Sequence, residues 1–455
     1  MAFLFRGLYA KIDKTFVRRN GGAAMKMGIV RGRVIDPGNF RDEICDILIE
    51  DGLIKKVGTL TEEVDRLVDA EGKCVMPGFI DLHVHLREPG GEKKETIETG
   101  TRAAAAGGVT TLCAMPNTFP VMDTPEKVLA YKEKCRREAL IDVLPIGAVT
   151  LAQDGNTLTD FKGMLEAGVC AFSEDGKSVM SSELAAEAFH EAAKYGALIM
   201  AHCEDKPLVR GGVMNAGKRA RELNLPGITN AVEDVVTARD VFLAGEAFAR
   251  LHICHASTRG AIKLVEEGKK LGYQVSAEVC PHHFTLSDRD IPCDDPNYKM
   301  NPPLRSARDV QALREGLKGG CVDAIATDHA PHTKDDKGTS MRKSAFGITG
   351  LETSAALVYT ELVEKGVLSL SDMVDKMSYQ PAKILRLCDR GVLSEGKRAD
   401  IVIFDPQDVW TIDPDAFYSK GRNTPFGGRR VKGRVVMTIK EGKPVYESER
   451  GIIHD

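Results

Sequence analysis

Residues 79–87 read F-I-D-L-H-V-H-L-R, a short apolar run that carries two histidines two positions apart. Because side chains alternate across a strand, His83 and His85 project to the same side, spaced as a pair of ligands for one metal ion. A coincidental pair is the simpler interpretation of this motif when it stands alone. The choice between a ligand pair and a coincidental pair depends on the other apolar runs of the chain and on the polar residues that end them.

Seven further apolar runs follow this one, and helical patterns separate them. Such alternation is typical of parallel β–α–β units, and eight of them over roughly 300 residues predict a closed barrel with its chemistry at the carboxyl ends of the strands. Thr124 and Pro125 open one helix as N-cap and first residue, and residues 182–195 predict another. The seven runs are residues 109–117, 141–148, 169–175, 197–203, 250–255, 273–280 and 322–329.

Short strands separated by turns occupy both ends of the chain. Residues 28–37, G-I-V-R-G-R-V-I-D-P, and residues 433–440, G-R-V-V-M-T-I-K, have the same texture. We therefore expect an α/β protein with a (β/α)8 TIM-like barrel over residues 78–390. A small flanking β domain would combine residues 27–77 and 391–447.

The first 26 residues are basic and mildly apolar, as targeting segments also are. Their apolar runs are too short and too often interrupted by charge for a signal-peptide core or a membrane span. We expect an extension without stable structure, or a start codon assigned too early, with Met25 or Met27 in place of Met1.

Composition restricts the class of partner. The 455 residues are 43% hydrophobic and 28% charged with a formal net charge of -4, so no basic surplus favours nucleic acid or a membrane surface. A small-molecule substrate fits this balance better. Eleven cysteines occur singly, from Cys45 to Cys388, without a C-x-x-C pair, which indicates a reducing, cytoplasmic compartment.

Histidines and carboxylates end four more of the predicted strands: Asp175, His202, His255 and Asp328. Buried acids and imidazoles are costly unless they are paired or bound to a metal. With the first pair, they make four histidines and two carboxylates, enough to hold two divalent cations that share one carboxylate. Glu174 competes with Asp175 for the shared position, and a carboxylated Lys177 is a third alternative that sequence cannot show.

Other histidines near these strand ends have plainer interpretations. His252 lies three positions before His255, so we expect it on the opposite side of the strand, facing the helices. His282 and His283 follow the seventh run, and a loop role at the barrel mouth is expected rather than ligation. His329 should point away from its neighbour Asp328.

The stretch D-L-H-V-H-L-R-E-P-G-G-E-K-K-E-T-I-E-T-G at residues 81–100 precedes M-P-N-T, N-P-P-L-R and T-D-H-A-P-H. In these motifs and their order the chain resembles the bacterial class I dihydroorotases of the amidohydrolase superfamily, from about Met27 to Tyr446. The resemblance implies two zinc ions per subunit. It also implies reversible cyclisation of N-carbamoyl-L-aspartate to (S)-dihydroorotate in de novo pyrimidine biosynthesis.

The resemblance also implies roles for individual residues. His83, His85 and Asp328 match the ligands of the more buried zinc, and His202 and His255 match those of the second. Asp175 matches the bridging acid, although the family's D-D-G segment here reads E-D-G at residues 174–176. Positions that match substrate-binding residues are His85, Arg87, Asn117, Asn301, His332, Phe346 and Gly347.

In the mechanism that follows, a hydroxide held between the metals attacks the ring amide carbonyl. Asp328 takes its proton and passes it to the leaving nitrogen, while Arg87 binds the substrate carboxylate. The polar segment 333–345, which follows His332, is an expected lid. The rivals are a hydantoinase or allantoinase and a catalytically dead homologue. A homodimer and an association with aspartate transcarbamoylase are open expectations.

Overall fold

The computed structural model describes residues 26–453, so residues 1–25, where the expected extension falls, lie outside it. Eight parallel strands form one sheet in the order β15-β14-β13-β10-β9-β8-β7-β6. A parallel bridge between Val84 and His329 joins its two edges and closes the barrel. Its strands are β6 (Phe79–Val84), β7 (Val109–Ala114), β8 (Asp142–Ala148), β9 (Ala171–Ser173), β10 (Leu198–Ala201), β13 (Arg250–Ile253), β14 (Val275–Val279) and β15 (Ala324–Ile325).

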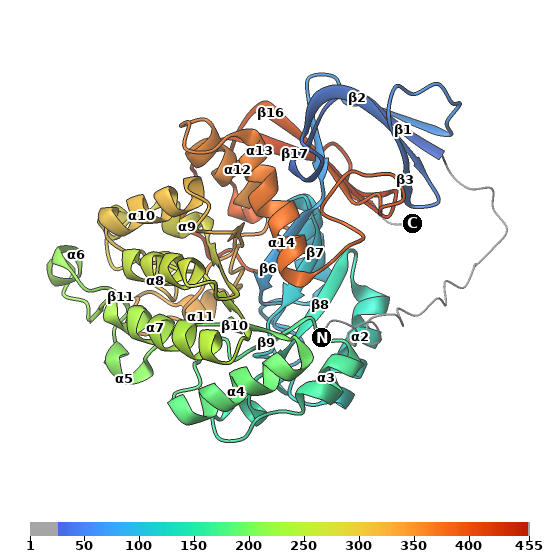
Figure 1. Ribbon diagram of the computed structural model, residues 1–455. Helices are drawn as coiled ribbons and strands as arrows, with labels where there is room; N and C mark the ends of the chain where they lie inside the picture. Colours follow the sequence, from blue (N-terminus) through green and yellow to red (C-terminus); the bar gives the residue numbers. More distant parts are fainter. Residues whose placement is uncertain (1–25, 454–455) are drawn as a thin grey trace.

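Each of the eight predicted runs therefore contains a barrel strand, and the fold class is confirmed. Helices ring these strands in Figure 1. Local chemistry sets their ends: the Thr124 side chain accepts from the Lys127 amide to cap α2, and α4 begins after the cap Ser181 and stops at Gly196, which is left-handed. The main helices are α1 (Ile97–Ala106), α2 (Pro125–Glu138), α3 (Phe161–Ala167), α4 (Ser182–Tyr195), α7 (Ala231–Glu246), α8 (Arg259–Lys270) and α10 (Ala307–Lys318).

Strand side chains divide between two apolar clusters. Ile199 and Ala201 of β10 join the cluster shared with the helices, whereas Leu198 and Met200 join a smaller one inside the barrel. Ala382 of α14 (Gln380–Leu385) belongs to the inner cluster as well. The inside of the barrel is thus filled with side chains.

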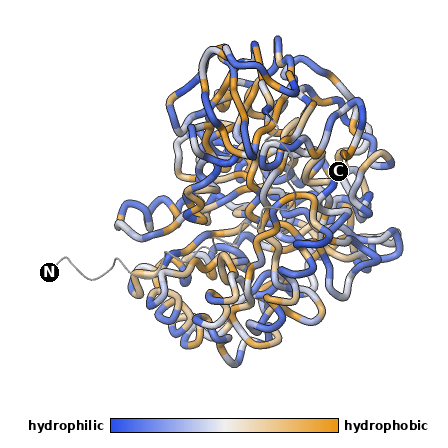
Figure 2. The backbone as a smooth tube through the Cα atoms, turned by 90° about the vertical axis from the view of Figure 1, so that its right-hand side faces the viewer, coloured by the Kyte–Doolittle hydropathy of each residue, from blue (hydrophilic) through white to orange (hydrophobic). Residues whose placement is uncertain are grey.

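A second sheet combines both ends of the chain, which Figure 1 shows in blue and red side by side. β5 pairs antiparallel with β16, and Pro77 lies opposite Ile401. In Figure 2 the hydrophobic stretches of this lobe run through its interior. Its strands are β1 (Lys26–Asp36), β2 (Arg41–Glu50), β3 (Leu53–Gly58), β4 (Arg66–Asp69), β5 (Cys74–Pro77), β16 (Ile401–Thr411), β17 (Arg430–Lys440), β18 (Lys443–Glu447) and β19 (Gly451–Ile452).

Short elements complete the chain and lie largely in the connections between barrel units. They are α5 (Lys206–Val209), β11 (Met214–Asn215), α6 (Lys218–Glu222), β12 (Gly227–Ile228), α9 (Pro281–Thr285), α11 (Lys334–Lys337), α12 (Ser354–Val358) and α13 (Leu370–Val374). Within residues 26–453, none of the helices has the length and apolar character needed to cross a membrane.

Candidate metal centre

Four side chains from three strand ends meet on one side of the centre. Nε2 of His83 lies 3.3 Å from Oδ1 of Asp175, and Nε2 of His85 lies 3.4 Å from Oδ2 of the same carboxylate. Oδ1 of Asp328 lies 3.2 Å from Nε2 of His85 and 3.6 Å from Nε2 of His83. All four residues are buried.

Two further histidines face the same carboxylate from the other side. Nδ1 of His202 lies 3.4 Å and Nε2 of His255 lies 3.6 Å from Oδ1 of Asp175, and these two nitrogens are 2.9 Å apart. Asp175 therefore stands between two groups of imidazoles, and each group forms with it a buried set of three donors.

This donor set fits two divalent cations. Ligands bound at about 2.0–2.2 Å in a tetrahedron lie roughly 3.3–3.6 Å apart, which is the spacing found around Asp175. Nε2 of His83 and Oδ1 of Asp175 are buried without a hydrogen-bond partner, although such atoms are costly to leave unpaired. Burial alone would raise the pKa of Asp175, but His83, His202 and His255 bring it well below its usual range, so the carboxylate is ionised.

Backbone strain marks two of the donors, His255 and Asp328, and the nearby Arg87. Arg87, His255 and Asp328 have φ values of 59°, 34° and 47°, a region that side chains with a Cβ rarely adopt. Such outliers cluster at functional sites, where surrounding structure holds them. After this turn His329 points away from Asp328, as expected, with Nε2 3.3 Å from Oε2 of Glu95.

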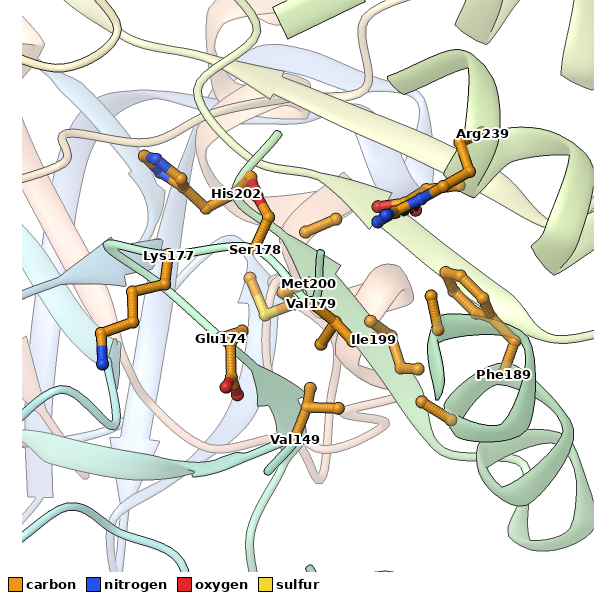
Figure 3. A pocket seen from close by; sticks show the side chains of 14 residues that line it. Val149, Glu174, Lys177, Ser178, Val179, Phe189, Ile199, Met200, His202 and Arg239 are labelled. Carbon is orange, nitrogen blue, oxygen red and sulfur yellow. Dashed lines mark hydrogen bonds and ion pairs between the residues drawn. The ribbon is translucent and has the colours of Figure 1, made fainter. Parts of the chain in front are cut away.

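The other candidates for the bridging position face elsewhere. The carboxylate of Glu174 accepts from the amide of Thr150 at 3.1 Å and from its hydroxyl. Nζ of Lys177 donates to the carbonyl oxygen of Gln153 at 2.7 Å. Figure 3 shows the Lys177 amine directed away from His202. Of the three alternatives, only Asp175 lies among the histidines.

A buried carboxylate behind His83 was not anticipated from the sequence. Oε1 of Glu278, on β14, lies 3.2 Å from Nδ1 of His83, and its Oε2 lies 3.0 Å from Nε2 of His252. Nδ1 of His252 in turn lies 2.8 Å from the Ser276 hydroxyl. The one sign of it in the sequence was a single acidic residue between the apolar Ala277 and Val279 of a predicted strand.

The expectation that His252 faces the helices is therefore wrong. Its neighbours Leu251 and Ile253 pack toward the helices, and His252 lies on the inner side of β13. The expectation assumed that side chains alternate from His252 to His255. This alternation does not hold, because β13 ends at Ile253 and His255 has a positive φ. His282 and His283 also depart from a loop role, since both are buried on the short helix α9.

A cluster of cationic side chains around His332 adjoins the donors, and we call it the cationic pocket. Nε of Arg87 donates to the carbonyl oxygen of Pro331 at 3.2 Å, and its Nη2 lies 3.2 Å from Nε2 of His332. Nζ of Lys94, which the sequence did not single out, lies 3.4 Å from Nδ1 of His332. Burial, then Arg87 and Lys94, lower the pKa of His332 to about 3, so this ring is neutral among two cations. The pocket suits an anionic group.

Asn117 and Asn301 were both expected to bind substrate. In the structure, each of them donates a hydrogen bond to a carboxylate. Oδ1 of Asn117 lies 2.9 Å from Nδ1 of His85, and its Nδ2 donates to Oδ2 of Asp175 at 3.2 Å. Nδ2 of Asn301 donates to Glu204, whose Oε2 lies 3.8 Å from Nε2 of His202. Asn117 thus links His85 and Asp175, two candidate metal ligands, through its side-chain amide.

The segment after His332 closes against the pocket. Nε2 of His332 donates to the carbonyl oxygen of Phe346 at 2.8 Å. Gly347 has a φ of 132°, and a Cβ there would meet Cβ of Ala330 at 2.7 Å, so the close approach requires glycine. Nζ of Lys337 donates to the Gly347 carbonyl oxygen at 2.9 Å and anchors the segment, whose role as a lid stays a prediction.

A small cavity lies behind the centre, between β10 and the helices α4 and α7, and is shown in Figure 3. Ile199 and Phe189 supply apolar walls, and Arg239 and Asp240 close one side with an ion pair. His202 reaches its rim, so the cavity backs onto the metal centre.

The chain is similar to known proteins in both sequence and fold. Residues 72–261 match the family model described as dihydro-orotase-like. The dihydroorotases of Bacillus cytotoxicus and Bacillus cereus are each 45% identical over 409 residues, which cover 90% of this chain and 95% of the relative. The solved L-hydantoinase (dihydropyrimidinase) of Arthrobacter aurescens is 28% identical with a TM-score of 0.86, covering 94% of this chain and 97% of that one. A D-hydantoinase (dihydropyrimidinase) from Thermus sp. has 26% identity and a TM-score of 0.81, with the same coverage.

Proposed function

The chain belongs to the dihydroorotase family, and from that premise we propose that its site forms and hydrolyses the ring amide of (S)-dihydroorotate. The open form is N-carbamoyl-L-aspartate, and the reaction serves de novo pyrimidine biosynthesis. The observation that carries the proposal is the position of Asp175 between two groups of histidines, beside a cationic pocket.

Two zinc ions per subunit are the cofactors that we propose. His83, His85 and Asp328 would hold one, His202 and His255 the other, with Asp175 shared between them. Bound there, the cations would acidify a water molecule and polarise the amide carbonyl. A catalytically dead homologue would lack donors, whereas all six meet here.

The chain's own groups would orient the substrate and move its proton. Arg87 offers a planar fork of donors to the exocyclic carboxylate, and Lys94 adds a second positive charge to the same pocket. Asp328, ionised beside His85, is placed to accept a proton from the attacking water and deliver it to the ring nitrogen. His332 and the Phe346–Gly347 backbone would close over the ring.

Hydantoinase activity is the second candidate, because solved structures similar to this chain include hydantoinases. Turnover of dihydroorotate, hydantoin and allantoin by the zinc-loaded protein separates the two. We expect dihydroorotate to give by far the highest kcat/KM. A higher value for hydantoin or allantoin would assign the chain to the other activity.

The remaining proposals concern organisation. We propose a barrel domain of residues 78–390, a composite β domain of residues 27–77 and 391–447, and a cytoplasmic location, supported by eleven cysteines that form no disulfide in the described range. A homodimer and an association with aspartate transcarbamoylase are proposed from the family resemblance. Light scattering with and without the transcarbamoylase tests both.

A further inference from the structure

A second group of metal-type donors lies at the end of β14, the strand between those that lead to His255 and Asp328. Cys280 follows this strand directly, and His282 and His283 occupy the short helix after it. One ligand atom from each of the three residues lies within 4.8 Å of the others, and all three residues are buried. None of them contributes a donor to the group around Asp175.

Each of the two imidazoles has a buried ring nitrogen without a hydrogen-bond partner. Nε2 of His283 lies 2.9 Å from the carbonyl oxygen of Pro302, which can only accept, so the ring proton is on Nε2 and Nδ1 is bare. Nδ1 of His283 is buried without a hydrogen-bond partner, and so is Nε2 of His282. The rings stand with centroids 4.1 Å apart. Burying such atoms without a partner is unfavourable, and a cation would satisfy both.

We propose that Cys280, His282 and His283 bind a third metal ion, of the zinc class, separate from the two-metal centre. One thiolate and two imidazoles suit a borderline transition metal, with a water molecule as fourth ligand. Bonds of about 2.0–2.3 Å require donors roughly 3.3–3.8 Å apart, so small side-chain rotations bring this cluster into place. The Cys280 thiol releases its proton to solvent when the ion binds.

Cobalt substitution tests the site without relying on activity. A thiolate bound to Co²⁺ gives a near-ultraviolet charge-transfer band, whereas the donors around Asp175 are only nitrogen and oxygen. We expect the metal-free protein, titrated with Co²⁺, to bind a third ion per chain as this band appears. Cys280→Ser should abolish the band and the third ion while two ions stay bound.

Two controls keep the test sharp. The Cys254 thiol lies near His83 and Glu278, so Cys254→Ser must leave the band in place. His282→Asn should require more Co²⁺ to develop the band, and His190→Asn, at an exposed histidine, should not. Cys280→Ala replaces the serine variant if circular dichroism shows that the latter is misfolded. Absence of a band in the wild type, its persistence without Cys280, or its loss with Cys254 would overturn the proposal.

Discussion

Oε1 of Glu278 lies 3.2 Å from Nδ1 of His83, on the ring edge opposite the nitrogen that faces Asp175. Burial would raise the pKa of Glu278, but hydrogen bonds from His252 and His83 lower it to about 2. The ionised carboxylate accepts a hydrogen bond from Nδ1–H of His83, which leaves Nε2 of His83 without a proton and able to bind a metal. We therefore propose Glu278 as a positioning residue for the candidate ligand His83.

Glu278→Gln should weaken zinc binding by about 10–100-fold, the range found when a carboxylate behind a histidine ligand is lost. Competition with a chromophoric chelator measures this directly. Glu267→Gln is the matched control, since that side chain is exposed and pairs with Lys270. Equal zinc affinity in the two variants would remove Glu278 from the site.

Arg87→Lys keeps the charge but loses the planar fork, so we expect a large rise in KM for dihydroorotate with metal content intact. Lys94→Gln should raise KM less, because Lys94 reaches the pocket through His332. Steady-state kinetics on preparations of known zinc content provide the measurement. Unchanged kinetics for Arg87→Lys would make Arg87 structural.

Stability should change with pH through Asp240, which closes one side of the cavity. Burial raises its pKa to about 6, against the effect of Arg239. Since this folded-state pKa exceeds the unfolded value, its stabilising contribution is present below pH ~4 and is lost as the pH rises through about 6. Asp240→Asn lacks this titration. Its free energy of unfolding relative to wild type should rise by up to about 3 kcal/mol between pH 4 and 7. Parallel pH profiles for the two proteins would contradict the assignment.

The fold followed from local patterns. Apolar runs located all eight barrel strands, capping chemistry placed the start of α2 after Thr124, and helical spacing placed both ends of α4. These signals are local because strand alternation and N-capping involve residues a few positions apart. The ligand candidates were found because each lies at or just after the carboxyl end of a strand, and these ends meet at the same mouth of the barrel.

What the sequence did not predict depends on contacts between distant residues. Glu278 reaches His83 across 195 positions, and no local pattern marks a single acid in an apolar strand as its partner. Lys94 enters the pocket from a loop 238 positions before His332. The error at His252 arose where a strand ends and the chain turns, because alternation no longer assigns sides there.

Asp328→Asn should separate ligation from proton transfer. The amide keeps the shape and one ligand oxygen but removes the basic site, so two zinc ions should stay bound while kcat falls by roughly 10²-fold or more. The acidic limb of the pH profile for hydrolysis should change as well, since it reports Asp328 coupled to its neighbours. Zinc must be counted in the same preparation. A fully metallated variant with wild-type turnover would leave Asp328 as a ligand only.

The most direct test of the proposed two-metal site is the zinc content and dihydroorotate turnover of Asp175→Ala, measured on one preparation beside Glu174→Gln. Asp175 contacts both groups of histidines, so its loss should remove at least one zinc per chain and nearly all activity. Glu174→Gln should keep both metals, because Glu174 contacts Thr150 and not the histidines. Two zinc ions retained in Asp175→Ala, together with a carboxylated Lys177 in its mass spectrum, would contradict the account.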